Sequence, residues 1–351
     1  MRSLLLLLLF LIHLPSPSLV RADGQSEKRR AIRGYHSHTR CGGKGHAHRT
    51  RPCPNNDTYC GEWKGRFWQP LGCKYELISP EKAATCIGNR TIAFIGDSQI
   101  RDLCVGLVYY LLGIYTLDTA PDTKFDRHLD ISDISDRIEN FDFWKENVPP
   151  HNYNGNIFPQ RNVSAQRGIQ WQIQMWSLYT GKFFENGQIE DILTNRMAKL
   201  GRGLRPIDIA FINIGVHDWG WFFEGDIGSK YYKSILGRFW LNYRDEVPVP
   251  TVWTSMNPEC IEKLSDTLSQ DKKDIQVNMV EVANAYANER LLKENKPYFD
   301  YAAPLRTPER CEHSADGLHV KMYVNVMAGI MLLNHLCDSH GNWRGNPSVF
   351  M

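Results

Sequence analysis

The chain has 351 residues, a formal net charge of +2, 42% hydrophobic residues and 11% aromatic residues. This composition supplies enough apolar side chains for a folded core, and the length allows one large domain or two small ones. Residues 53–351 hold 31 Lys or Arg against 37 Asp or Glu, without a basic stripe. We therefore expect no nucleic-acid partner.

The first 22 residues, MRSLLLLLLFLIHLPSPSLVRA, combine an early Arg, a leucine run and small residues after it. This pattern predicts a secretory signal peptide, residues 1–22, cleaved after Ala22. A membrane anchor is the alternative, but the apolar run is shorter than the about 20 residues that span a bilayer. We expect no transmembrane segment after cleavage, and a mature protein that is secreted or lies in the lumen of the secretory pathway.

Cysteines and glycosylation motifs also indicate an oxidising compartment. The chain has nine cysteines, and N-glycosylation sequons begin at Asn56, Asn89 and Asn162. The number of possible pairings is too large for any one disulfide to be predicted. An odd count leaves a thiol over, and Cys104 is the candidate because a free cysteine packs as a small hydrophobe in a buried helix.

Composition divides the rest of the chain into a tail and one domain. Residues 23–52 are polar, basic, histidine-rich and nearly free of aliphatic side chains, which predicts a disordered tail. Its H-x-H pairs define no coordination geometry in a flexible segment, so we expect no metal site there. Residues 53–345 are expected to form the domain, with an entry segment, 53–90, pinned by disulfides.

From residue 91, strand-like and helix-like patterns alternate, which predicts an α/β fold with a three-layer, doubly wound parallel sheet. Strands are expected over 91–95, 169–175, 207–214, 249–256 and 297–301. Helices are expected over 101–113, 229–246, 274–294 and 320–337. One face of the 274–294 helix is expected to bury Met279, Val282, Ala283 and Tyr286.

The stretch 114–168 interrupts this alternation. It is rich in Asp and weakly periodic, and a long insertion on an α/β sheet is often a lid or a wall of a substrate site. The Asp residues of this stretch could alternatively bind calcium. The acids lack the Gly and the final Glu of an EF-hand loop, so a solvated acidic face is expected.

The motif F-I-G-D-S-Q-I-R-D places Ser98 between a predicted strand and a predicted helix. The carboxyl end of a parallel strand is where open α/β sheets bind ligands, and a helix N-terminus can stabilise a developing oxyanion. Gly96 permits the turn, and Asp97 is expected to brace it. The structural alternative is that Asp97 and Ser98 only cap the helix.

A second motif, S-A-D-G-L-H-V, lies just before the last predicted helix. A serine nucleophile needs a base, and histidine is the usual one near neutral pH. That histidine needs a carboxylate on its other nitrogen. Asp316 and His319 could each be a helix-start residue alone, but together with Ser98 they predict a catalytic triad.

The order GDS…DGLH resembles the SGNH (GDSL-like) hydrolases, which have a flavodoxin-like sheet. More closely, WQPLGCKYELISPEKAATCIGNRTIAFIGDSQIRDL resembles the luminal domain of the sialic acid O-acetyltransferase family and its PC-esterase relatives. The resemblance implies Ser98 as nucleophile, His319 as base and Asp316 as the orienting carboxylate. Its specific motifs lie near residues 68–103, 211–219 and 315–319.

The oxyanion donors are left open. The segment FINIGVHDW lies where the oxyanion-hole segment of SGNH hydrolases is expected. Those enzymes usually have a G-x-N-D block there, whereas this chain has N-I-G-V-H-D. The resemblance to GDSxxR proteins implies Arg101 as one donor, and His217 could bind substrate. The oxyanion or substrate-binding candidates are Arg101, Asn213, the Gly215 backbone and His217.

The resemblance implies O-acyl transfer to glycan hydroxyls, as in sialic acid O-acetylation, through an acyl-enzyme at Ser98. No bound cofactor is expected, although a transferase needs an acetyl donor such as acetyl-CoA. The chain lacks the multi-pass membrane portion of the animal transferase, so a glycan or sialate O-acetylesterase is the alternative. A non-catalytic secreted glycan-binding protein is the second alternative. Side chains that would suit either sugar stacking or a core are Trp68, Trp171, Trp176, Trp219 and Trp221.

Overall fold

The protein is described by a computed structural model that covers much of the predicted domain. The described residues are 41, 61–71, 73–124, 156–157, 161–164, 169–177, 193, 206–213, 230, 232–234, 236–237, 249–264, 270–294, 296–338 and 342–343. The predicted signal peptide, the tail apart from Cys41, and most of the 114–168 insertion lie outside these residues. Every element named below belongs to one compact unit, Ser37–Met351.

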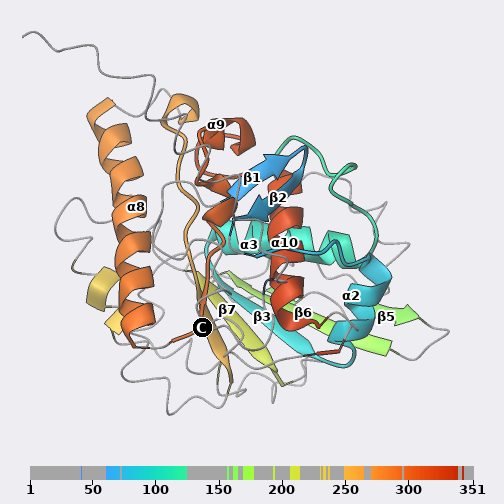
Figure 1. Ribbon diagram of the computed structural model, residues 1–351. Helices are drawn as coiled ribbons and strands as arrows, with labels where there is room; N and C mark the ends of the chain where they lie inside the picture. The colour runs from blue at the N-terminus through green and yellow to red at the C-terminus, as the bar shows by residue number, and fades with distance from the viewer. Residues whose placement is uncertain are drawn as a thin grey trace, which may run out of the picture. The chain divides into compact units, whose positions relative to one another are not determined.

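The central element is a sheet with strands in the spatial order β4-β6-β3-β7-β8-β9 (Figure 1). Its strands are β3 (Thr91–Gly96), β4 (Asn156–Ile157), β6 (Ile169–Ser177), β7 (Ile209–Asn213), β8 (Thr251–Thr254) and β9 (Tyr298–Phe299). Strands β6, β3, β7, β8 and β9 are parallel. In chain order they read 2-1-3-4-5, which is the flavodoxin-like arrangement. The predicted doubly wound α/β fold is confirmed.

An antiparallel edge completes the sheet. β4 pairs with β6, and β5 (Arg161–Ser164) pairs with β6 as well. Both strands come from the segment that the sequence marked only as an insertion.

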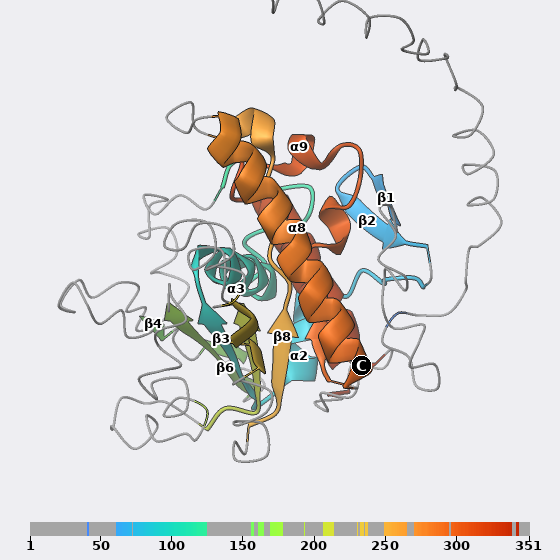
Figure 2. The ribbon, with the colours of Figure 1, turned by 90° about the vertical axis from the view of Figure 1, so that its left-hand side faces the viewer.

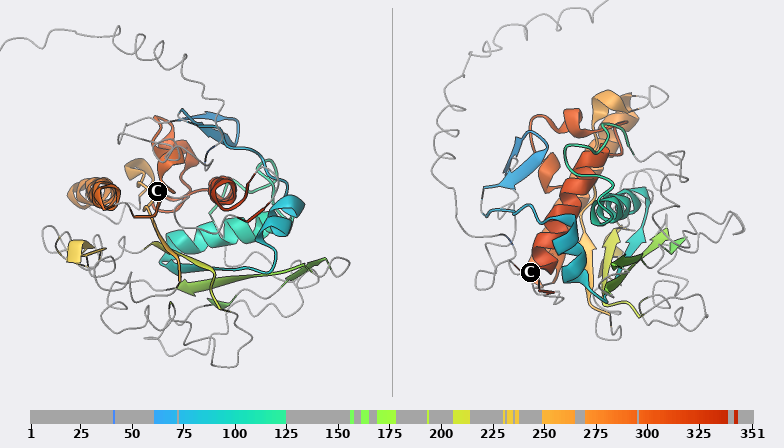
Figure 3. Two further views of the ribbon diagram at one scale, coloured as in Figure 1. Left: turned by 60° about the horizontal axis from the view of Figure 1, so that its bottom comes forward. Right: turned by 90° about the vertical axis from the view of Figure 1, so that its right-hand side faces the viewer.

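Helices cover both faces of the sheet. Successive side chains of a strand point to opposite faces, so the apolar strands have side chains to bury on each side. On β3, Phe94 belongs to the core cluster that includes α3 (Ser98–Leu111) and α10 (Met322–Leu336), whereas Ile95 belongs to the cluster that includes α8 (Gln270–Lys293). α3 and α10 lie side by side on the first face (Figures 1 and 3), and α8 crosses the second (Figure 2). The helices are α2 (Pro80–Ile87), α3 (Ser98–Leu111), α8 (Gln270–Lys293), α9 (Arg310–His313) and α10 (Met322–Leu336).

Two of the predicted helices differ from the structure in detail. α3 begins three residues before the predicted 101–113 helix, because Asp97 caps it and satisfies the Gln99 N–H. On α8 the prediction for Val282 is wrong: its side chain is 55% exposed. The residues spaced three and four apart that do lie in the core are Val280, Ala283, Ala287 and Leu291. Met279 and Tyr286 pack at the edge of the same cluster.

The entry segment forms a hairpin, β1 (Gly61–Lys64) and β2 (Phe67–Pro70), which packs against the C-terminal part of the domain. Trp63 Nε1 donates to the Pro304 carbonyl at 2.8 Å in η5 (Ala303–Leu305). The Trp63 ring also stacks on His313 at a centroid distance of 4.3 Å. The disulfide Cys41–Cys73 holds the next stretch, so the predicted disulfide-pinned segment is confirmed.

The cysteines of the described residues form three disulfides: Cys41–Cys73, Cys86–Cys337 and Cys260–Cys311. Cys104 is buried in α3 and unpaired, as predicted. Disulfides of this number are typical of proteins that fold in an oxidising compartment. Among the described residues no helix has the length and apolar character to cross a membrane.

We expect removal of the Cys86–Cys337 disulfide, by Cys86→Ala with Cys337→Ala, to lower the free energy of unfolding by about 4–5 kcal/mol. This bond joins residues 251 positions apart, and a cross-link over a long loop restricts the unfolded chain most. Urea denaturation under non-reducing conditions measures the change. Cys104→Ala is the matched control, because it removes a buried sulfur without a cross-link and should cost only about 1 kcal/mol. An equal loss in both variants would contradict the prediction.

Candidate active site

Ser98 lies at the topological switch point of the sheet. The chain leaves β3 at Gly96, turns through Asp97, and enters α3 with Ser98 as its first residue. From β3 the chain passes to β6 on one side, and then to β7 on the other. Such a switch point is where ligands bind in open α/β sheets. The Ser98 residue is 8% exposed.

Gly96 makes the turn into α3 possible. Its φ is 146°, and a Cβ on it would lie 1.7 Å from the Asn213 carbonyl oxygen on β7. The Asp97 N–H donates to the same oxygen at 3.3 Å. The Asp97 carboxylate accepts from the Gln99 N–H at 2.9 Å, so the predicted bracing role of Asp97 is confirmed. The backbone of β7 thus fixes where the nucleophile turn begins.

Asp316 and His319 come from the tight loop between α9 and α10. The Ala315 N–H donates to the His319 carbonyl at 2.8 Å and closes the loop. Gly317, at φ 95°, has its Cα against the Leu264 backbone, where a Cβ would lie 2.6 Å from the Leu264 nitrogen. The Gly317 carbonyl accepts from Cys260 N–H at 2.8 Å. The loop is therefore fixed both internally and from the 260–264 side.

The structure joins the three predicted triad residues in one hydrogen-bonded chain. His319 Nε2 lies 2.8 Å from Ser98 Oγ. On the other side of the ring, His319 Nδ1 lies 3.0 Å from Asp316 Oδ2 and 3.3 Å from Oδ1. Backbone N–H groups of Leu318 and His319 donate to Asp316 Oδ1 at 3.0 and 2.7 Å. The imidazole can thus accept a proton from Ser98 while its other nitrogen donates to the carboxylate.

The Asp316 carboxyl is held ionised by its neighbours. Burial acts to raise its pKa, but this is outweighed by the hydrogen bond and charge of His319 and by the hydrogen bond from Lys124. The net result is a pKa far below the ordinary value. Asp316 therefore stays charged through the mildly acidic range.

Two of the four oxyanion candidates lie in the described residues, and both donate elsewhere. Arg101 Nε and Nη2 donate to Asp102 Oδ1 at 3.0 and 2.7 Å. Asn213 Nδ2 donates to the Thr254 carbonyl at 3.3 Å and to that of Ser255 at 2.6 Å. Two carbonyl acceptors fix this amide orientation, since the reverse would set oxygen against oxygen. Gly215 and His217 lie outside the described residues.

Two residues near the triad carried no signal in the sequence. Gln99 links the nucleophile helix to two loops: Nε2 donates to the Leu318 carbonyl at 3.3 Å, and Oε1 accepts from the Asn257 N–H at 2.9 Å. Lys124 Nζ lies 2.7 Å from Asp316 Oδ2. Gln99 could have been suspected as the neighbour of Ser98. Lys124, which is 192 positions from Asp316, could not.

The structure also places some of the tryptophans proposed for sugar stacking and one of the predicted glycosylation sites. The described tryptophans of the proposed sugar-stacking set, Trp68, Trp171 and Trp176, are all buried in the core, so they cannot stack on a sugar. Trp219 and Trp221 lie outside the described residues. Asn89 is exposed just after α2, as a glycosylated residue would need to be. Asn56 and the side chain of Asn162 lie outside the described part.

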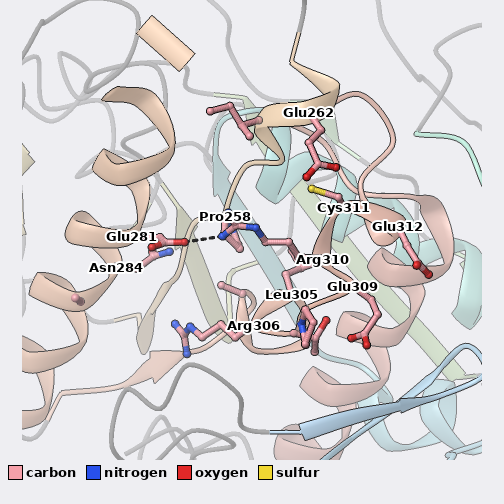
Figure 4. A pocket seen from close by; sticks show the side chains of 15 residues that line it. Pro258, Glu262, Glu281, Asn284, Leu305, Arg306, Glu309, Arg310, Cys311 and Glu312 are labelled. Carbon is pink, nitrogen blue, oxygen red and sulfur yellow. Dashed lines mark hydrogen bonds and ion pairs between the residues drawn. The ribbon is translucent and has the colours of Figure 1, made fainter. Parts of the chain in front are cut away.

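A cavity of about 860 Å³ lies between α8, η4 (Ile261–Lys263), η5 and α9 (Figure 4). Glu281 on α8 and Arg310 on α9 form an ion pair of 2.7 Å at its wall. None of the three triad residues lines it. In the described residues, the one group with metal-ligand spacing is Cys260, Glu262 and Cys311. Its cysteines form a disulfide and offer no thiolate.

Comparison with known proteins gives limited similarity. No protein-family model matches the chain. A solved structure described as a GDSL-like lipase, from Parabacteroides merdae, is 14% identical with a TM-score of 0.37 and covers 71% of this chain and 96% of its own. A solved acetyl xylan esterase, AlAXEase, is 11% identical with a TM-score of 0.34 and covers 69% and 97%. We infer no residue role from either.

Proposed function

We propose that this protein is a serine-dependent acyl-ester enzyme of the SGNH (GDSL-like) type. Ser98 is the nucleophile, His319 the general base, and Asp316 the carboxylate that orients it. The observation that carries the proposal is the continuous chain of contacts, 2.8 Å from Ser98 Oγ to His319 Nε2 and 3.0 Å from His319 Nδ1 to Asp316 Oδ2. This series of contacts begins at Ser98, at the sheet edge where α/β folds bind ligands.

In the first step, Ser98 Oγ bonds to the ester carbonyl carbon while its proton passes to His319 Nε2. The carbonyl oxygen becomes an oxyanion. As the tetrahedral species collapses, the bond to the leaving group breaks, and His319 returns the proton to it; the leaving group is an alcohol from an ester and a thiol from a thioester such as acetyl-CoA. An acyl group then remains on Ser98 as an ester.

In the second step, water or a sugar hydroxyl attacks the acyl-enzyme while His319 takes its proton. Collapse breaks the bond to Ser98 Oγ, and the proton returns to Ser98. Water yields a free acid, and a sugar hydroxyl yields a new ester. Asp316 supports the imidazolium in both steps and keeps its own charge.

For the oxyanion, we propose the Ser98 N–H at the start of α3, where the helix dipole also favours negative charge. The donor set of Asn213 supports this choice, because its amide nitrogen donates to the Thr254 and Ser255 carbonyls and would have to leave them to act. Arg101 bonds Asp102 through Nε and Nη2 and stays a candidate. The Gly215 backbone and His217 remain candidates for a second donor.

The finer proposal is O-acetyl transfer to glycan hydroxyls, such as those of sialic acid, in the secretory pathway or outside the cell. An acetyl donor such as acetyl-CoA would be a co-substrate, and no bound cofactor takes part in the steps above. The disulfides and the exposed sequon at Asn89 support that location. Hydrolysis of an O-acetylated glycan is the alternative, since the same triad serves both reactions.

Hydrolysis of p-nitrophenyl acetate by the wild type and by Ser98→Ala tests the enzyme proposal. We expect release of p-nitrophenol by the wild type and only the background rate in the variant. Equal rates would reject the proposal in favour of a glycan-binding protein without catalysis.

A second experiment separates transfer from hydrolysis. The protein is incubated with acetyl-CoA and sialylated glycans, and in parallel with O-acetylated glycans, and the products are analysed by mass spectrometry. Gain of an acetyl group on the first set supports transfer, whereas loss of one from the second set supports hydrolysis. Ser98→Ala is the control in both arms.

A further inference from the structure

The carboxylate of the triad has a cationic partner from outside its own loop. Lys124 Nζ lies 2.7 Å from Asp316 Oδ2. The same oxygen lies 3.0 Å from His319 Nδ1. The other oxygen, Oδ1, accepts from two backbone N–H groups of the loop. Lys124 and His319 therefore share one carboxylate oxygen.

The backbone on either side of Lys124 is anchored. The Thr123 carbonyl accepts from the Met322 N–H, at the start of α10, at 2.9 Å. Upstream, the guanidinium of Arg66 in the β1–β2 turn holds the preceding loop. Its Nη1 donates to the carbonyls of Leu117, Asp118 and Ala120 at 3.0, 3.1 and 2.6 Å, and its Nη2 to Asp122 Oδ1 at 3.0 Å.

Arg66 is fixed in turn by its position 5.0 Å above the ring of Tyr323 on α10. The hairpin, the 117–124 loop and α10 thus form one connected support for the lysine. The fixed backbone leaves only the side chain of Lys124 to be ordered when it pairs with Asp316.

The other charged groups around the Asp316–His319 pair have different partners. Lys263 Nζ from η4 donates to the Ser314 carbonyl at 2.7 Å. On α3, Asp97 caps the helix and Asp102 pairs with Arg101. Lys321, before α10, and Lys263 both act to lower the pKa of His313, which burial lowers most. Of these described groups, Lys124 is the cation that contacts the triad carboxylate.

We infer that Lys124 is a positioning residue that sets how tightly His319 holds its proton, by sharing Asp316 with it. The inference rests on the proposed function. The positive charge of Lys124 offsets part of the carboxylate's negative charge at the ring, so the imidazolium is less stabilised. Without Lys124, the carboxylate would stabilise the imidazolium more strongly and the base form would require a higher pH.

The test is the pH dependence of kcat/KM for p-nitrophenyl acetate in the wild type, Lys124→Met and Lys124→Arg. Lys124→Met is expected to move the acid limb upward by about half to one pH unit, because opposite charges in contact shift a titration and solvent screens this pair. The Lys124 and Asp316 side chains are 52% and 32% exposed. Lys124→Arg keeps the charge and should restore the wild-type limb.

Lys64→Met is the matched control. It removes a lysine from another surface ion pair, Lys64–Glu62 at 3.0 Å on the hairpin, and so makes the same change in net charge away from the triad. Its acid limb should match that of the wild type. If Lys124→Met lowers the rate equally at every pH, or shifts the limb no more than Lys64→Met, Lys124 is only structural and the inference is overturned.

A second readout separates failure of the inference from failure of the proposed function. The His319 ring signals, assigned in histidine-labelled protein by their loss in His319→Ala, are followed with pH by NMR. An upward shift of their titration in Lys124→Met supports the inference even if no ester is hydrolysed. An unchanged titration overturns it even if the wild type is an active esterase. Thermal unfolding of each variant establishes that it is folded.

Discussion

His319→Ala is expected to lower kcat for p-nitrophenyl acetate by at least about 10⁴-fold. Without the imidazole 2.8 Å from Ser98 Oγ, the hydroxyl has no base and remains a weak nucleophile. Steady-state kinetics at saturating substrate measures the change. Its size should match that of Ser98→Ala, because residues that act as a unit have non-additive effects.

Two controls distinguish this expectation from general damage. Added imidazole should restore part of the activity of His319→Ala, since it can enter the space of the ring, but should not rescue Ser98→Ala. His313→Gln should remain within a few-fold of the wild type. His313 is a nearby buried histidine, with Nδ1 at 2.6 Å from the Tyr323 hydroxyl and no contact with the triad. A small effect of His319→Ala would mean that another group acts as the base.

Gly96→Ala is expected to lower the free energy of unfolding by about 4 kcal/mol or more. The new Cβ would lie 1.7 Å from the Asn213 carbonyl oxygen in the centre of the sheet, and neither backbone can move without breaking the β3–β7 pairing. The positive φ of 146° adds strain for any residue with a side chain. Urea denaturation followed by circular dichroism gives the change.

Gly113→Ala is the matched control for the backbone strain alone. Gly113 also has a positive φ, 67°, but a Cβ there would meet nothing within 4 Å. We expect a loss of only about 1–2 kcal/mol, the cost of a left-handed conformation. If Gly96→Ala is no worse than Gly113→Ala, the close approach of β3 to β7 is not what requires glycine.

The strands and the triad could be predicted because their signals are local. Short, strongly apolar runs mark buried parallel strands, and β3 is buried along its whole length. Asp316 and His319 are three residues apart and belong to one loop, so a single turn brings them together. The position of Ser98 then follows from the switch point of a doubly wound sheet.

What could not be predicted depends on contacts between distant segments. Lys124 reaches Asp316 because the Arg66 turn and α10 hold its loop, and no sequence pattern encodes that arrangement. Asn213 looked like an oxyanion donor, but its amide nitrogen donates to the Thr254 and Ser255 carbonyls at the end of β8. Val282 was misplaced because helical spacing alone did not show which of two adjacent faces would meet the sheet.

The local support of the triad suggests why this domain keeps an N-terminal hairpin. Trp63 stacks on His313 at the end of α9, and Arg66 lies over the ring of Tyr323 at the start of α10. Both contacts tie the hairpin to the helices that flank the Asp316–His319 loop. The hairpin therefore belongs to the scaffold of the site rather than to a separate module.

Reaction with a fluorophosphonate, followed by mass spectrometry of the proteolytic peptides, tests whether Ser98 is a nucleophile activated by His319. We predict one covalent adduct, on Ser98, in the wild type, none in Ser98→Ala, and a far slower reaction in His319→Ala. An unlabelled wild-type Ser98, or labelling at the same rate in His319→Ala, would contradict the account.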